Sequence, residues 1–109
     1  MQENRRVYEI IRFEDVEVKK GHCGIVRRLY ENDISLDFVE IKDAKEHYHE
    51  KSTEYYFIVE GEGKVILNGR EFYVKSGDLV VIPPRIIHKA EGNMKVLVIG
   101  VPKVIEHKF

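Results

Sequence analysis

β-Branched aliphatic residues dominate the apolar content of this chain of 109 residues, and this bias restricts its fold more than any other feature. The sequence contains 14 valines and 12 isoleucines, against 5 leucines and 2 alanines. Branching at Cβ removes side-chain freedom in a helix and suits the pleated surface of a strand. We therefore predict an all-β domain.

Short segments in which apolar and polar residues alternate follow one another along most of the chain, separated by turn residues. Asn68-Gly69 is the strongest turn signal, because a two-residue hairpin turn needs positive φ at both centres. Pro83-Pro84 ends another segment, because proline donates no hydrogen bond to a sheet. Eight short strands in one domain are typical of a sandwich or barrel. The predicted strands are 24–30, 34–41, 54–60, 64–68, 71–74, 79–82, 86–90 and 94–101.

The two ends of the chain carry weaker signals. Residues 1–15 fit a helix or an edge strand equally, with Val7, Ile10, Ile11 and Glu14 at rough helical spacing. The charged tail 103–109 is expected to fray or to pack on a partner.

Charge and composition exclude several classes of function. With 18 basic and 19 acidic side chains the net charge is −1, so the chain has no basic field for nucleic acid or anionic lipid. No apolar run approaches the roughly 20 residues of a membrane helix, and no secretory signal is evident. Cys23 is the single cysteine, which indicates a reducing cytoplasm and a small buried side chain. Abundant Lys and Glu with one glutamine favour a thermophilic source.

Two of the five histidines, His47 and His49, form an H-x-H pair. On an extended segment both rings point to the same face, although two solvent-facing imidazoles would fit this charged stretch as well. Glu54 opens the next apolar strand, and His88 follows the strand that ends at Pro83. Three imidazoles and one carboxylate are a ligand set for one divalent transition metal, with Mn, Fe, Co, Ni, Cu and Zn all open. These four residues are the candidate metal ligands.

The spacing around the first of these residues resembles the first sequence motif of the cupin family. Four residues separate the H-x-H pair from Glu54, and six residues separate Glu54 from Gly61. We place this motif at about 41–61. Ile41 stands where the family usually has a glycine.

A second segment, at about 77–92, resembles the second cupin motif through Gly77, Pro83 and His88. The fifteen residues between the two motifs are similar to the spacing in small single-domain microbial cupins. Arg85 and Gly92 stand where the family usually has glycine and asparagine. These positions govern turns and not ligation.

The resemblance implies a small double-stranded β-helix, the cupin or jelly-roll barrel, as one domain over residues 1–109. It also implies that His47, His49, Glu54 and His88 fill all four family ligand positions. The segments around 61–65 and 82–84 look most like mannose-6-phosphate isomerase-type barrels. We therefore expect a metal-dependent isomerase-type enzyme for a small polar substrate such as a sugar or sugar phosphate. A non-enzymatic ligand-binding barrel and a metal-dependent dioxygenase or decarboxylase are the alternatives.

Strand alternation from an inward Glu54 extends the candidate site. It places Tyr56 and Glu60 on the cavity side, as candidate catalytic residues. Three arginines are candidates for contacting an anionic substrate: Arg27, Arg28 and Arg85.

The same alternation points Tyr55, Phe57 and Val59 outward, where a barrel of this size leaves them exposed. A second copy would cover them. We therefore expect a homodimer.

Overall fold

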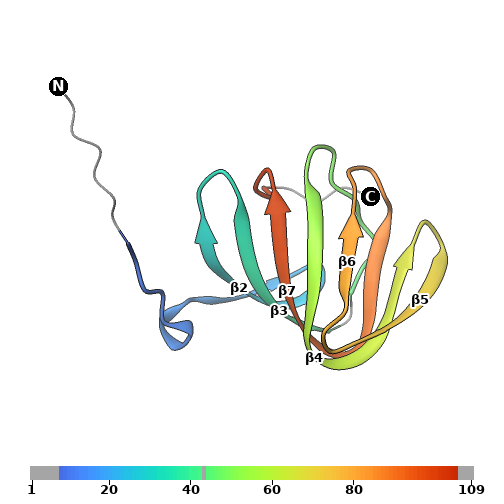
Figure 1. Cartoon of the computed structure of the whole chain (residues 1–109), viewed down its shortest axis with the longest axis horizontal. Helices are drawn as coiled ribbons and strands as arrows, with labels where there is room; N and C mark the ends of the chain where they lie inside the picture. The colour runs from blue at the N-terminus through green and yellow to red at the C-terminus, as the bar shows by residue number, and fades with distance from the viewer. Residues whose placement is uncertain (1–7, 43, 106–109) are drawn as a thin grey trace.

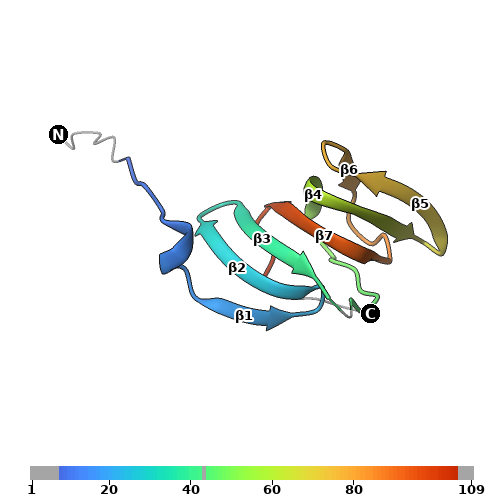
Figure 2. The same ribbon diagram turned by 90° about the horizontal axis from the view of Figure 1, so that it is seen from below.

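β-Strands make up the regular structure of residues 8–42 and 44–105, the part of the chain that the computed structural model describes, together with one short 3-10 helix, η1 (Phe13–Asp15). Figures 1 and 2 show the strands curving into a barrel. The strands are β1 (Val18–Gly21), β2 (Gly24–Glu31), β3 (Ser35–Ile41), β4 (Thr53–Leu67), β5 (Arg70–Lys75), β6 (Leu79–Ile82) and β7 (His88–Val101).

All seven strands belong to one antiparallel sheet with the order β1-β2-β3-β7-β4-β5, and β6 pairs with β4. The predicted all-β barrel is confirmed. No helix in the described ranges has the length and apolar character needed to cross a bilayer.

Two pairs of predicted strands each form one long strand. The glycines between the paired segments resemble turn residues but lie within β4 and β7. A Cβ on Gly61 would come within 2.0 Å of the carbonyl oxygen of Asn93, and one on Gly63 within 2.1 Å of the carbonyl oxygen of Glu91. These glycines therefore permit the close approach of β4 and β7. The segments 54–60 and 64–68 are joined as β4, and 86–90 and 94–101 are largely joined as β7.

The Asn68-Gly69 hairpin is confirmed. Both residues have positive φ, of 48° and 84°, and Leu67 pairs with Arg70 across the turn. β1 lies outside the predicted strands, and its four residues are all exposed.

A bulge between Ile58 and Glu60 reverses which side chains of β4 face the interior. Before the bulge Glu54, Tyr56 and Ile58 are buried, and beyond it the buried series resumes at Val65. The prediction that Glu60 faces the cavity is therefore wrong, because the extra residue shifts the alternation and leaves Glu60 exposed.

The interior is filled by aliphatic side chains of the central strands. Val39, Ile58, Val65 and Val96 are each at most 4% exposed and belong to one contiguous core. Cys23 joins this core, as predicted. Tyr56 and Cys23 belong to this core and also border the polar residues of the candidate site.

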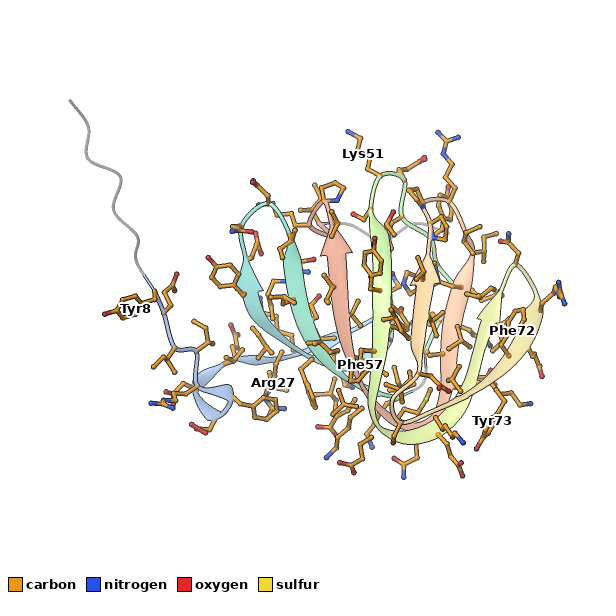
Figure 3. All side chains as sticks on the ribbon, viewed as in Figure 1. Tyr8, Arg27, Lys51, Phe57, Phe72 and Tyr73 are labelled. Atoms are coloured by element: carbon orange, nitrogen blue, oxygen red, sulfur yellow. The ribbon has the colours of Figure 1, made fainter. Side chains whose placement is uncertain are left out.

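The outer face of the sheet is apolar along β4 and β6. Phe57 and Val59 are 40% and 44% exposed, and Phe57 pairs with the exposed Leu79 of β6. Tyr55 pairs with the exposed Val81 in the next row. Figure 3 shows Phe57 on this face of the barrel.

The N-terminal segment follows neither prediction over its described part, 8–17, where η1 is the regular element. Val7 lies outside the described residues. Phe13 of η1 packs edge-to-face on Phe38 at 5.1 Å between ring centroids. At the other end, Val104 is buried and its backbone N–H donates to Ser35 Oγ at 3.0 Å, while 106–109 lie outside the described residues.

Candidate metal centre

His47, His49, Glu54 and His88, hereafter the His/Glu cluster, come together in the buried interior of the barrel. His47 forms an isolated bridge with His88, the first residue of β7, through two backbone hydrogen bonds of 3.1 and 2.8 Å. The His49 carbonyl accepts a bond of 2.8 Å from the Arg85 backbone N–H. Backbone pairing therefore positions the H-x-H segment beside the start of β7.

The ligand atoms of the four residues lie within 4.8 Å of one another, and all four side chains are buried. Glu54 Oε1 is 3.0 Å from His88 Nε2 and 3.1 Å from His49 Nε2. Burial by itself would raise the pKa of the Glu54 carboxyl. The neighbouring imidazoles of His49 and His88 have a larger opposite effect, and the pKa is lowered to about 2. The carboxylate is therefore ionised at neutral pH.

Backbone carbonyls set the proton positions on two of the imidazoles. His47 Nδ1 lies 2.9 Å from the Lys45 carbonyl oxygen, and His88 Nδ1 lies 2.8 Å from the Ile86 carbonyl oxygen. A carbonyl only accepts, so each Nδ1 carries the hydrogen and each Nε2 carries a lone pair when the ring is neutral. Such a hydrogen bond is the usual support of a metal-ligating histidine.

The buried oxygen and nitrogen atoms of the cluster fit a cation. Glu54 Oε1 and His88 Nε2 are fully buried and 3.0 Å apart, yet neither has a hydrogen-bond partner in proper geometry. With His88 neutral, two lone pairs face one another, which is unfavourable unless a positive charge lies between them. A divalent metal would supply this charge, so the cluster could hold one.

A cavity of about 390 Å³ opens beside the cluster. Its lining includes Glu54 and Tyr56 of β4, Cys23, and, farther away, Arg28 of β2 and Asp37 of β3. The described part of the chain thus has both a candidate metal centre and room for a small molecule next to it.

The candidate catalytic residue Tyr56 lines this cavity and is 1% exposed. Its hydroxyl lies 3.8 Å from Cys23 Sγ, which in turn lies 3.9 Å from His47 Nε2. Burial raises the pKa of Tyr56 well above 10, with further contributions from Cys23 and Glu54, and burial raises the pKa of Cys23 to about 12. Both groups therefore remain protonated at neutral pH.

Glu60 does not join the site. Its side chain is 71% exposed, and its carboxylate lies 4.0 Å from the ammonium group of Lys95. The bulge in β4 separates it from the cavity.

The three candidate arginines have different surroundings. Arg27 lies over the Phe13 ring at 4.2 Å from its centroid, and Figure 3 shows it beside the N-terminal segment. Arg85 is exposed, with its Nε 3.1 Å from Glu50 Oε1. Only Arg28, of these three, lines the cavity.

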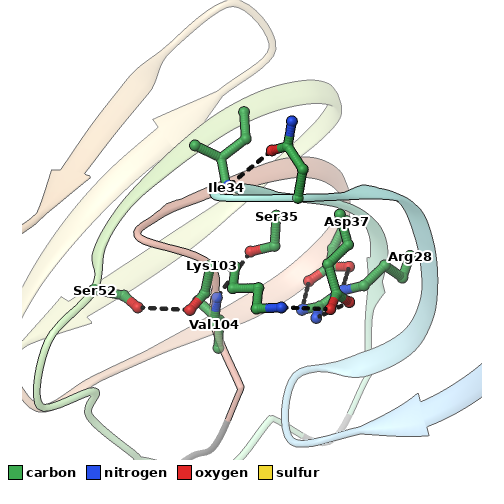
Figure 4. Close-up of polar contacts among 9 residues, drawn as sticks. Arg28, Ile34, Ser35, Asp37, Ser52, Lys103 and Val104 are labelled. Atoms are coloured by element: carbon green, nitrogen blue, oxygen red, sulfur yellow. Dashed lines mark hydrogen bonds and ion pairs between the residues drawn. The ribbon is translucent and has the colours of Figure 1, made fainter. Parts of the chain in front are cut away.

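Sequence reasoning missed the partner of Arg28, the inward-facing Asp37 on β3. Asp37 pairs with Arg28 across the sheet and forms two hydrogen bonds with its guanidinium group (Figure 4). A signal was available, because Asp37 shares the apolar face of its strand with Val39 and Ile41. A carboxylate on such a face needs a partner.

Comparisons with known proteins agree with this architecture. The family model described as "Cupin domain" matches residues 39–100. An uncharacterized protein of Methanocaldococcus jannaschii is 43% identical over 60 residues, which are 51% of this chain and 48% of that protein. The chain therefore matches about half the length of this curated relative.

Solved structures extend the similarity to nearly the whole fold. A protein from Planctomyces limnophilus has a TM-score of 0.87 at 22% identity, covering 94% of this chain and 97% of that one. The Streptomyces nucleoside dehydratase Pac13 has a TM-score of 0.82 at 21% identity, covering 94% and 93%. KdgF from a Halomonas species has a TM-score of 0.77 at 19% identity, covering 90% and 96%. With its barrel, both of its motifs and the match to the family model, this chain belongs to the cupin family.

Proposed function

We propose that this protein is a metal-dependent enzyme acting on a small polar substrate, with one divalent transition-metal ion held by His47, His49, Glu54 and His88. The observation that carries the proposal is the buried cluster itself, whose four ligand atoms lie within 4.8 Å of one another, with Glu54 Oε1 3.0 Å from His88 Nε2. Four protein ligands leave about two positions of an octahedron open, as a catalytic metal requires and a closed structural site does not. The adjacent cavity, which Glu54 lines, would give a substrate access to the metal from that side.

We propose redox-neutral isomerisation of a sugar or sugar phosphate as the reaction. When bound, the metal would supply positive charge that polarises a substrate oxygen. The protonated Tyr56 hydroxyl faces the cavity and would donate a hydrogen bond to the substrate. Solvent water in the cavity would accept the proton from C2, the carbon beside the C1 carbonyl group, as the electron pair forms the C1–C2 double bond of an enediol and the C1 oxygen gains a proton. Water would then return a proton to C1 while the C2 hydroxyl loses its proton and becomes the new carbonyl group. Removal of a proton beside a carbonyl also begins many dehydrations, the activity named for the structural neighbour Pac13.

Solvent exchange tests this proposal directly. Metal-loaded protein is incubated in deuterated buffer with a panel of aldoses, ketoses and their phosphates, and NMR follows exchange of the C2 proton. We expect exchange with at least one sugar and its loss after chelation, while the circular dichroism spectrum is unchanged because the apolar core forms without the ion. No exchange with any sugar would contradict isomerisation and favour the ligand-binding barrel or oxygen chemistry.

Variants at two tyrosines separate the role of Tyr56 from a general effect of losing a hydroxyl. Tyr56→Phe is expected to slow exchange by about 10²-fold, a typical contribution of a positioned proton donor. The matched control is Tyr73→Phe, because Tyr73 is 64% exposed on β5. Equal rates in both variants would remove Tyr56 from the mechanism.

We also propose that a second copy covers the outward apolar face formed by Tyr55, Phe57, Val59, Leu79 and Val81. Burial of apolar surface at about 25 cal/mol per Å² makes such a face a favourable dimer contact. Analytical ultracentrifugation at micromolar concentration should give a dimer for the wild type and a monomer for Phe57→Glu. A monomeric wild type would contradict this arrangement.

A further inference from the structure

A second polar group faces the same cavity on the wall formed by β2 and β3. Arg28 and Asp37 are directly paired across these strands. Arg28 Nε donates to Asp37 Oδ1 at 2.8 Å, and Nη2 donates to Oδ2 at 2.9 Å, so the two side chains form a fork (Figure 4). Two parallel bonds between guanidinium and carboxylate fix both groups in one orientation.

The fork leaves Arg28 little capacity to hold an anion. Its third nitrogen, Nη1, donates to Glu31 Oε1 at 3.1 Å, and Glu31 also accepts from Lys103 Nζ at 3.1 Å. Two cations thus alternate with two carboxylates, and the network is neutral. A phosphate placed here would meet the negative charges of Asp37 and Glu31 before it found an uncommitted guanidinium hydrogen.

The fork lies on the same curved sheet as Glu54 and Tyr56, and its Asp37 lies two strands away from β4. Asp37 pairs with Val98 of β7, and Val98 pairs with Tyr56 of β4, so the three share one row across the sheet. Neighbouring strands are about 4.8 Å apart, which places the backbones of Asp37 and Tyr56 about 10 Å from one another. Glu54, Tyr56 and both residues of the fork line the same cavity of about 390 Å³, which has room for a molecule of monosaccharide size between Glu54 and the fork.

The remaining charged residues of the cavity lining do not make it attractive to anions. Lys19 and Lys20 line it from β1, but both are exposed and accompanied by Glu17. Exposed ammonium groups are strongly hydrated and bind anions weakly.

We propose that the Arg28–Asp37 fork selects ligands whose end remote from the His/Glu cluster carries hydroxyl groups and no charge, such as an unphosphorylated sugar or polyol. A hydroxyl group both donates and accepts, so it can use the remaining lone pairs of Asp37 and the remaining hydrogens of Arg28. This inference rests on the proposed function and narrows its substrate class from sugars and sugar phosphates to unphosphorylated sugars. It makes the fork a specificity-determining pair without a role in the proton transfer.

The first experiment frees Arg28 and uses inorganic phosphate as the probe, on metal-free protein. Asp37→Asn keeps the shape of the side chain and removes the charge, so it should bind phosphate about ten-fold more tightly than the wild type in calorimetric titration. The double variant Arg28→Gln, Asp37→Asn should lose this gain. Glu71→Gln is the matched control, because it removes a carboxylate from the exposed Lys64–Glu71 pair outside the cavity lining.

Equal phosphate affinity in the wild type and Asp37→Asn would overturn the inference, because Arg28 would then be available already. Thermal melting checks that Asp37→Asn is folded. If it is not, Glu31→Gln replaces it and should bind phosphate about three-fold more tightly, since it frees one nitrogen instead of two. This arm needs no metal, so its result is independent of whether the cluster binds an ion.

The second experiment uses matched ligands on metal-loaded protein, with metal content measured on the same samples. Mannose is compared with mannose 6-phosphate, and ribose with ribose 5-phosphate. The wild type should bind each neutral sugar at least about ten-fold more tightly than its phosphate, and Asp37→Asn should reduce or reverse that preference. Tighter binding of the phosphates by the wild type, or binding of neither member of either pair, would overturn the inference. Absence of metal in the loaded samples would instead contradict the proposed function.

Discussion

Glu54 and Asp37 are two inward-facing carboxylates on the wall of one cavity, and their surroundings differ in a way that indicates what each does. Asp37 receives two well-formed hydrogen bonds from Arg28, so its charge is matched within the chain. Glu54 faces imidazole nitrogens at 3.0 and 3.1 Å, and its Oε1 has no hydrogen bond in proper geometry. A carboxylate whose partners are complete serves as fixed structure, whereas one that faces imidazole nitrogens is matched only when a proton or a metal ion supplies positive charge.

Among the changes predicted here, removal of one imidazole of the His/Glu cluster should have the largest effect, which is a loss of bound metal. His88→Ala deletes a ligand whose Nε2 lies 3.0 Å from Glu54, and we expect metal content after dialysis to fall more than about ten-fold. Glu71→Gln is the matched control, because Glu71 forms an exposed pair with Lys64 outside the four-residue cluster and the cavity lining, so its loss should leave metal content unchanged. Unchanged metal content in His88→Ala would show that the ion, if any, binds elsewhere.

Acidification should release the ion while leaving the fork intact. Protons compete with metal for imidazoles, whose ordinary pKa is near 6.5, so occupancy should fall as pH drops below about 6. The pKa of Glu54 is about 2, so its carboxylate stays charged through this range and the loss follows the histidines. Arg28 stays charged as well, because its hydrogen bond to Asp37 raises its pKa. Equilibrium dialysis with metal analysis checks this prediction, and full occupancy at about pH 4 would contradict histidine ligation.

The fork should contribute to stability in the absence of any metal. Asp37→Asn removes two charge-assisted hydrogen bonds, and we expect the free energy of unfolding to fall by about 1–2 kcal/mol, allowing for partial exposure of Arg28. Glu71→Gln, which breaks an exposed pair, should change it by less than about 0.5 kcal/mol. Urea denaturation of metal-free protein measures both. Equal effects would mean that the fork behaves as an ordinary surface ion pair.

The smallest change in the free energy of unfolding is expected for substitutions of Arg85, which lies beside the His/Glu cluster. Its φ of 70° is left-handed, which costs a non-glycine residue about 1 kcal/mol, while its exposed contact with Glu50 contributes little. Arg85→Gly should therefore raise the free energy of unfolding by about 0.5–1 kcal/mol, and Arg85→Ala, which keeps the strain, should not. Metal content should stay the same in both, because the backbone N–H of residue 85 still donates to His49. A loss of metal in Arg85→Gly would show that the side chain itself supports the cluster.

Local pattern was sufficient for much of the fold and for the candidate ligands. The excess of Val and Ile predicts strands, Asn68-Gly69 predicts the hairpin, and the four ligand residues are recognisable from their types and spacing. Each of these depends on residues that are near in the chain or on a side-chain period of two, which is a property of any strand.

The pairing between strands determined two features that side-chain alternation alone does not predict: which residues of β4 face the cavity, and the role of its glycines. The bulge after Ile58 results from how β4 matches β7, and it turned Glu60 away from the cavity that Tyr56 faces. Gly61 and Gly63, which resemble turn residues, instead allow two backbones to approach closely, which depends on a partner strand about 30 residues away.

The sequence by itself determined an all-β chain with a metal-type ligand set, because strand propensity, turn chemistry and ligand chemistry belong to individual residues and short segments. Only the tertiary structure decided that Lys45 and Ile86 carbonyls orient the imidazoles, and that Arg28 is bound by Asp37 instead of being available to a substrate. Hydrogen-bond partners depend on distances between segments, and alternation within one strand contains no information about the charge that the neighbouring strand places opposite.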